Sequence, residues 1–156
     1  MKMDTRLSAM LHVLLHMGQP GSDGGEAITS EQMARYMDTN PVVVRRTMSG
    51  LREAGIVQSQ KGHGGGWTLT RPLASISIGE IYRALGSPGL VAIGNRNDNP
   101  SCLIEKAVNR TLGDALSEAE RLIVARMDAV TLADIADQFR DRMAEFNQAM
   151  KEHGHV

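Results

Sequence analysis

The chain has 156 residues, of which 42% are hydrophobic and 22% charged, and its formal net charge is −1. This length suits one domain or a small domain with an appendage, and the single cysteine excludes an internal disulfide. No apolar run is long enough for a membrane span and no signal-peptide pattern is present, so a cytoplasmic protein without a membrane partner is expected.

Residues 4–17 are predicted to form an amphipathic helix, because apolar side chains recur at helical spacing. The expected inward face consists of Leu7, Met10, Leu11, Leu14 and Leu15. His12 and His16 lie one turn apart and could share a metal ion, but a surface pair is the simpler interpretation and no metal site is predicted. The glycine-rich segment 18–26 is expected to be a flexible connector.

Residues 29–54 have the pattern of two helices separated by a tight turn. Thr29 and Gln32 have the spacing of a capping box at the start of the first helix. Residues 38–40 are expected to form the turn, and Asn40 with Pro41 suits the start of the second helix. The buried stripe expected on that second helix is Val44, Met48 and Leu51.

Gly55 can end the second helix in a left-handed conformation. Two strand-like runs follow at 56–61 and 67–70, on either side of a glycine-rich tip at 62–66. Helix, turn, helix and β-ribbon in this order predict a winged helix-turn-helix, which places its second helix in the major groove of DNA.

The outer face of the second helix and the tip of the ribbon carry the chemistry expected for DNA. Arginine can bind a guanine edge through two hydrogen bonds, and an apolar side chain can contact the thymine methyl group. Polar side chains and helix N-termini can bind phosphate. The residues predicted to contact DNA are Thr29, Ser30, Thr39, Asn40, Pro41, Val42, Val43, Arg45, Arg46, Ser49, Lys61, His63, Gly64 and Gly65. Taken singly, each feature favours a simpler interpretation, a solvated arginine face or a mobile hairpin. The complete ordered set favours DNA binding.

Charge is divided unevenly along the chain. Residues 29–71 contain six Arg or Lys and three Asp or Glu, a local charge of +3, whereas residues 98–156 contain seven basic and eleven acidic side chains, a local charge of −4. A dimer would double the positive charge that faces the phosphates.

The C-terminal half is predicted to be helical. Ser77 and Glu80 form a second capping box, Gly86 closes a short helix, and residues 87–100 are expected to form a loop. A long helix is expected from residue 100 or 101 to about residue 128, which is roughly 40 Å. Its apolar stripe is Ile104, Val108, Leu112, Ala115, Ala119, Leu122 and Ile123.

The predicted head is too small to cover such a stripe, so we expect it to meet its copy in a homodimer. Packing of the two C-terminal helices against each other within one chain is the alternative. Thr131 and Asp134 are expected to cap the last helix, and the tail after residue 152 to fray. The expected fold is mainly α (α+β), with a winged helix-turn-helix DNA-binding domain at 1–86, a linker at 87–100 and a helical dimerisation region at 101–156.

Four motifs resemble the Rrf-type winged helix-turn-helix regulators of bacteria, a family that includes the iron–sulfur cluster regulator, the nitric-oxide-sensitive repressor and the cysteine-metabolism regulator. They are TNPVVVRRTMSGLREAGIV, the wing SQKGHGGGWTLTR, the segment SISIGEIYRAL, and CLIEKAVNRTLGDAL with a downstream TLADIAD. The resemblance spans nearly the whole chain, and LREAG paired with a GGGW wing is its most specific part. It implies a homodimer with crossed long helices that represses or activates at a partly palindromic operator.

The sensing residues depart from this family. Cluster-binding members carry three cysteines near the start of the long helix; Cys102 matches the last of them and Glu105 a further ligand of some members. One thiolate cannot hold an iron–sulfur cluster, so no cofactor is expected. Cys102 is instead a candidate redox sensor, because the first turn of a helix favours a thiolate. The alternatives are an unreactive cysteine packed against the head, and a small ligand bound between loop 87–100 and the head.

Enzyme activity is not expected. Residues 63–66 (HGGG) resemble an oxyanion-hole motif, but the chain contains no G-x-S-x-G nucleophile elbow. The sequence therefore predicts a sequence-specific regulator, most simply a repressor, that binds double-stranded DNA as a homodimer and responds to an oxidant or an unknown small molecule. The alternatives are a metal- or ligand-sensing regulator of the same fold, and a protein-interaction module that does not bind DNA.

Overall fold

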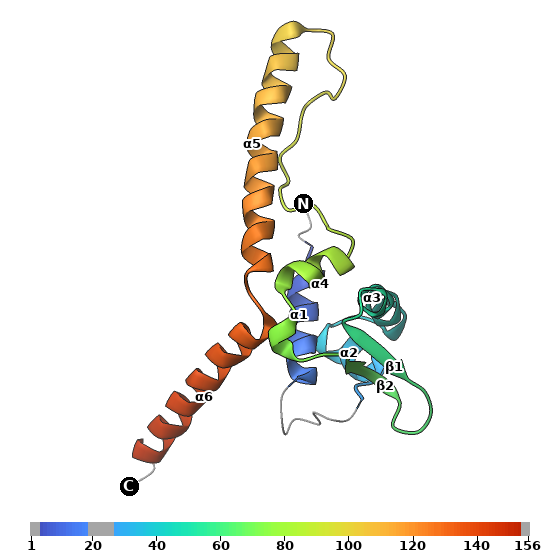
Figure 1. The fold of residues 1–156 in the computed structure, drawn as a ribbon, viewed down its shortest axis with the longest axis vertical. Coiled ribbons are helices and arrows are strands. Elements are labelled where there is room, and N and C mark those ends of the chain that lie inside the picture. Colours follow the sequence, from blue (N-terminus) through green and yellow to red (C-terminus); the bar gives the residue numbers. More distant parts are fainter. Residues whose placement is uncertain (1–3, 19–26, 154–156) are drawn as a thin grey trace.

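The structure, a computed structural model, describes residues 4–18 and 27–153, with side chains as far as residue 142. The predicted connector beyond Gly18 and the tail after His153 lie outside the described residues. The elements are α1 (Arg6–Met17), α2 (Ser30–Tyr36), α3 (Pro41–Glu53), β1 (Val57–Gln60), β2 (Gly66–Leu69), the 3-10 helix η1 (Leu73–Ser75), α4 (Ile78–Ala84), α5 (Leu103–Asp128) and α6 (Leu132–His153). A head of four helices and a two-stranded sheet carries two long helices that leave it in different directions (Figure 1). The mainly α fold predicted from the sequence is confirmed.

One hydrophobic core holds the head together. It is built almost entirely from aliphatic side chains and methionine, because the chain has few aromatic residues. Its fully buried members include Met10, Val13, Leu14, Met33, Val44, Met48, Leu51, Ile56, Ile76 and Ile81. The predicted inward stripe of α3 is therefore confirmed, and the burial of Val13 adds a position that the predicted face of α1 did not contain.

Local hydrogen bonds set the ends of the first two helices after the connector. The Thr29 hydroxyl accepts from the backbone N–H of Gln32 at 3.1 Å, and the Gln32 side chain accepts from the Thr29 N–H at 2.8 Å. The Asn40 side chain accepts from the N–H groups of Val42 and Val43 at 3.0 and 3.1 Å. These caps satisfy amides that have no partner within the helix, and both were predicted.

Gly55 ends α3 as predicted, with a positive φ of 72°. Its N–H donates to the carbonyl of Arg52 at 3.0 Å, and the N–H of Ile56 donates to the carbonyl of Leu51, also at 3.0 Å. This is the Schellman arrangement, in which the left-handed residue lets two amides reach back to the last turn. It turns the chain directly into the sheet, where β1 pairs with β2 in antiparallel register from Val57↔Leu69 to Gln60↔Gly66.

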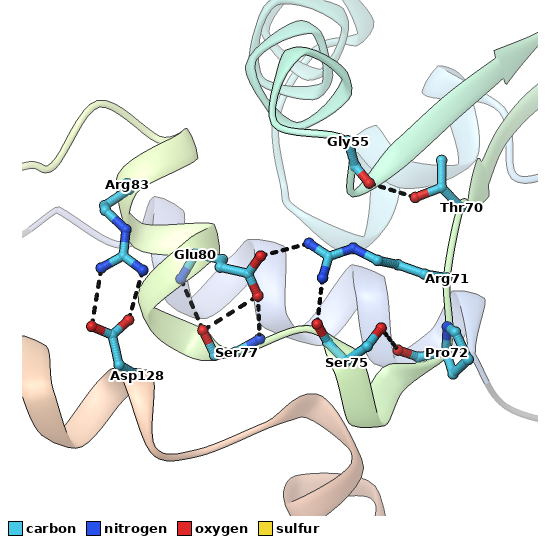
Figure 2. Close-up of polar contacts among 9 residues, drawn as sticks. All are labelled: Gly55, Thr70, Arg71, Pro72, Ser75, Ser77, Glu80, Arg83 and Asp128. Carbon is cyan, nitrogen blue, oxygen red and sulfur yellow. Dashed lines mark hydrogen bonds and ion pairs between the residues drawn. The ribbon is translucent and has the colours of Figure 1, made fainter.

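A row of polar contacts joins the sheet to α4 and α4 to the end of α5 (Figure 2). Arg71, just after β2, binds the Glu80 carboxylate at 2.6 Å and the carbonyl of Ser75. Glu80 in turn accepts from the Ser77 N–H at 3.0 Å, which completes the predicted capping box of α4. One turn later Arg83 holds Asp128 through two hydrogen bonds of 2.7 and 3.2 Å. The long helix is thereby fastened to the head at one end only.

The Glu80 contacts give a pH-dependent prediction. The Arg71 guanidinium and the Ser77 amide lower the pKa of Glu80 below its ordinary value of 4.5. A lowered pKa stabilises the fold above the unfolded-state value, and this contribution is lost as the pH falls through the folded-state value. Glu80→Gln should therefore reduce the free energy of unfolding at pH 7 by about 1 kcal/mol or less, since the side chain is 36% exposed. The deficit should shrink below about pH 4.5.

Urea denaturation at pH 7 and pH 3 measures this change. Glu53→Gln is the matched control, because Glu53 is an exposed carboxylate at the end of α3 with no ion pair within the described residues. A deficit for Glu80→Gln that is equal at both pH values would contradict the assignment.

The long helices differ from expectation in two respects. α5 begins at Leu103 rather than at residue 100 or 101, because Cys102 keeps an extended backbone and its side chain makes no cap. α6 begins inside the head core rather than beyond it, since Leu132 is fully buried there and Ile135 packs against the same cluster. The predicted dimerisation region, residues 101–156, therefore also contributes side chains to the core of the head.

Candidate nucleic-acid interface

The face of α3 away from the core is exposed over its first two turns. Val42 is 70% exposed, and Val43, Arg45 and Arg46 also lie in solvent. Neither valine packs against the hydrophobic core of the described chain. Together with the neighbouring guanidinium groups, they form the mixed apolar and cationic surface that base edges in a major groove require.

The two arginines have different surroundings. Arg45 forms an ion pair of 2.8 Å with Glu31 on α2, and both side chains are about half exposed. Arg46 makes no hydrogen bond or ion pair with any residue that the structure describes. Arg46 therefore has no partner to give up within the described residues, whereas a new partner of Arg45 would have to displace Glu31 or bind beside it. No sequence pattern predicts this pair, because it joins residues 14 positions apart.

The prediction for the side chain of Ser30 is wrong. It was expected to contact DNA, but it is 7% exposed and its hydroxyl accepts a hydrogen bond of 3.1 Å from the indole Nε1–H of Trp67. The side chain of Ser30 therefore anchors the wing to the start of α2 and is not available to a phosphate. The backbone of the wing is held at the same point, because Ile28 and Trp67 exchange two hydrogen bonds of 2.9 and 3.0 Å.

We predict that Trp67→Phe reduces the free energy of unfolding by about 1–2 kcal/mol, because it removes a buried hydrogen bond and leaves the Ser30 hydroxyl without its donor. Thermal or urea denaturation measures the loss. Ser30→Ala and the double variant complete a cycle, in which the two effects should sum to more than the effect of the double variant. Strict additivity would argue against an energetic contribution from the indole–hydroxyl contact.

The glycines of the wing are required by the hairpin itself. A Cβ atom on Gly65 would lie 2.6 Å from the carbonyl oxygen of Gln60, and one on Gly66 would lie 2.6 Å from that of Ile28. The tip therefore folds tightly, and it presents Lys61 and His63 to solvent. The other predicted contact residues divide by exposure: Asn40 and Gly64 are exposed, and Thr29, Thr39, Pro41 and Ser49 are half-buried.

Among the residues that the structure describes, none buries the apolar stripe of α5. No residue of α5 is buried, and Ile104, Val108, Leu122 and Ile123 are exposed. The two long helices diverge from the head, so the alternative of packing them against each other is not what the structure shows (Figure 1). An exposed row of isoleucine, valine and leucine side chains is an apolar patch of the kind found at interaction surfaces.

Cys102 is exposed at the N-cap of α5, so the alternative of a cysteine packed against the head is wrong. Beside it lies a hollow of about 510 Å³ between the loop and the first turns of α5. This hollow is bordered by Gly94, Asn95, Arg96, Cys102, Ile104, Glu105, Val108, Asn109 and Leu112. A ligand in this hollow would contact α5 rather than the head. A small ligand between loop 87–100 and the head stays a prediction.

The donor groups near Cys102 do not suit an iron–sulfur cluster. Cys102 is the only cysteine of the chain, and Glu105 is paired with Arg96 at 3.5 Å. Within the described residues no three or more His, Cys, Asp or Glu side chains are grouped so as to hold a metal ion. The same part of the chain contains no helix with the length and hydropathy of a membrane span.

Comparison with known proteins places these features in context. The profile of the Rrf2 family, described as an iron-dependent transcriptional regulator, matches residues 3–138. YwnA of Bacillus subtilis, named as an HTH-type transcriptional regulator, is 30% identical over 132 residues, which cover 85% of this chain and 95% of YwnA. The HTH-type transcriptional repressor NsrR of Streptomyces coelicolor is 28% identical over 72% of this chain and 74% of its own. The solved structure of IscR from T. potens shares the fold, with a TM-score of 0.59 at 21% identity over 88% of each chain.

Proposed function

This chain belongs to the Rrf2 family of transcriptional regulators, and on that premise we propose that it is a sequence-specific DNA-binding regulator whose α3 enters the major groove. The observation that carries the proposal is the uncovered outer face of α3, with exposed Val42 and Arg46 directly after the Asn40 cap. The wing would then lie along the backbone, where Lys61 can pair with a phosphate.

A homodimer on a palindromic operator is part of the same proposal. The exposed stripe of α5 supports it, because two copies of the stripe can cover each other around a two-fold axis. The Arg83–Asp128 contact fixes the end of α5 to the head, so the pairing of two helices would also set the separation of two reading heads. Repression is favoured over activation by the name of the relative NsrR. We place the protein in the cytoplasm, where bacterial promoters are, and propose no enzyme activity.

Footprinting on promoter fragments from the genome of origin tests this function. We expect protection of two half-sites about one helical turn, or roughly 34–36 Å, apart, with an affinity that falls steeply as salt rises. A protein that protects no fragment but captures a protein partner would support the alternative of an interaction module.

A redox response through Cys102 is a second, narrower proposal, favoured by the exposure of the thiol beside an open hollow. The thiolate would attack one oxygen of hydrogen peroxide and break the O–O bond, which forms a sulfenic acid. The second oxygen would leave as hydroxide and take a proton from solvent to become water. Cys102→Ser should then retain full operator binding after peroxide treatment, whereas the parent loses it and recovers with a thiol reductant. An equal response of both proteins would reject Cys102 as the sensor.

We propose further that no iron–sulfur cluster is bound, since the chain offers one thiolate where such clusters need several. Iron and sulfide analysis of protein purified without air tests this proposal, and stoichiometric iron with sulfide would overturn it.

A further inference from the structure

Two histidines on α1 point their ring nitrogens at one place. The Nε2 atoms of His12 and His16 are 2.9 Å apart, and the ring centroids are separated by 4.7 Å with a tilt of 56°. Their spacing of one helical turn puts both rings on the same face, an arrangement that binds zinc elsewhere. The spacing in the sequence predicts that the rings share a face, but only the structure shows that their Nε2 atoms lie close together.

Tyr36 holds this pair from the neighbouring helix. The His16 ring stacks on Tyr36 with a centroid distance of 5.1 Å and an interplanar angle of 9°, and His12 meets the same ring edge-on at 6.2 Å. Tyr36 is the last residue of α2, immediately before the turn that leads to α3. The two imidazoles are therefore oriented by an aromatic neighbour rather than left to rotate freely.

A hollow of about 300 Å³ opens beside the pair, between α1 and the first turns of α6. It is bordered by His12, Leu15, His16, Ile135, Ala136 and Phe139. A water molecule occupies about 30 Å³ in the liquid, so this space can hold several waters next to the ring nitrogens. The lining contains no lysine or arginine side chain that would repel a metal ion.

We propose that His12 and His16 bind a divalent transition-metal ion, such as Ni²⁺, Zn²⁺ or Cu²⁺, through their Nε2 atoms. Metal–imidazole bonds of about 2.0–2.1 Å separate the two nitrogens by about 3.3 Å at the tetrahedral angle of Zn²⁺ and by about 2.9 Å at the right angle of Ni²⁺ or Cu²⁺. At most a small rotation of the two rings is therefore needed. Imidazole suits these ions. With two protein ligands and water in the remaining positions, the site would exchange its ion readily.

The bound ion would act next to the DNA-reading helices. Fixing the His16 ring changes its stacking on Tyr36, and Tyr36 ends the helix that precedes the reading helix. This consequence rests on the proposed function, whereas the metal site itself does not.

Calorimetric titration of the metal-free full-length chain with Ni²⁺ tests the site without DNA. We expect His12→Gln and His16→Gln each to weaken Ni²⁺ binding by roughly tenfold or more, because even outer-shell partners of a metal are worth that much. His63→Gln on the wing and the double variant His153→Gln, His155→Gln in the tail are matched controls that should bind like the parent. Parent-like binding by both α1 variants, or loss of binding in the tail variant, would overturn the site.

Operator binding with and without Ni²⁺ supplies the second measurement. The parent should change its DNA affinity when Ni²⁺ is added and His16→Gln should not. A parent whose affinity is the same with and without Ni²⁺ would reject the link to α2, and a parent that binds no DNA at all would count against the proposed function while the titration still decides the metal site.

Discussion

A Leu122→Asp variant is expected to be a monomer at concentrations where the parent is a dimer, and to bind the operator about 10²–10⁴ times more weakly. Leu122 lies on the apolar stripe of α5 and is 67% exposed in one chain, so the substitution costs the isolated chain little. In a symmetric dimer it would place two carboxylates in an apolar interface, and each unpaired buried charge costs several kcal/mol. The loss in DNA affinity follows because two linked heads bind far more tightly than one.

Sedimentation and gel-shift titration measure the two effects separately. Ser117→Asp is the matched control: it adds the same charge to the middle of α5, at an exposed position on the opposite side of the helix from the stripe. A Leu122→Asp protein that remains dimeric would remove the stripe from the interface. If both variants become monomeric, the interface is wider than the stripe.

The helix-turn-helix of α2 and α3 could be predicted from the sequence because the contacts that set the ends of its helices are local. Both partners of the cap at Thr29 lie three residues apart, and Asn40 with Pro41 sets the start of α3 through amides two and three residues on. Gly55 ends the same helix because few other residues adopt its backbone conformation easily. Each of these contacts joins residues only a few positions apart, so it can be predicted without knowledge of the tertiary structure.

The contacts that the sequence could not supply join distant positions. Trp67 and Ser30 are 37 residues apart, and their hydrogen bond turns a predicted DNA contact into part of the scaffold. Arg45 and Glu31 meet only because α2 and α3 pack against each other. Leu132 lies within the predicted dimerisation region 101–156, yet it is buried in the core of the head. Periodicity identifies which side chains are apolar on one face, but not which surface covers them.

The ion pair of Arg45 also changes what is expected of the two arginines on α3. Breaking the ion pair with Glu31 would offset part of the binding free energy that Arg45 gains from DNA, by up to about 1 kcal/mol for an exposed pair. Arg46 has no such partner within the described residues. The greater share of base discrimination is therefore expected at Arg46.

Arg46→Ala should weaken binding to the specific operator by about 1–3 kcal/mol and relax the base preference at one position of each half-site. Arg45→Ala should cost less. Quantitative gel shifts on the operator and on single-base variants measure both effects. Lys61→Ala provides the contrast, because loss of a phosphate contact weakens all sequences alike and lowers the dependence on salt.

Arg110→Ala is the matched control for charge, since it removes one exposed arginine from the N-terminal third of α5, away from the Asp128 end that contacts the head. It should bind like the parent. If Arg46→Ala instead weakens operator and random DNA equally, Arg46 contacts phosphate, and α3 lies on the backbone rather than in the groove. If it binds both like the parent, the outer face of α3 is not the reading surface, and the exposed valines beside it would need a protein partner to account for them.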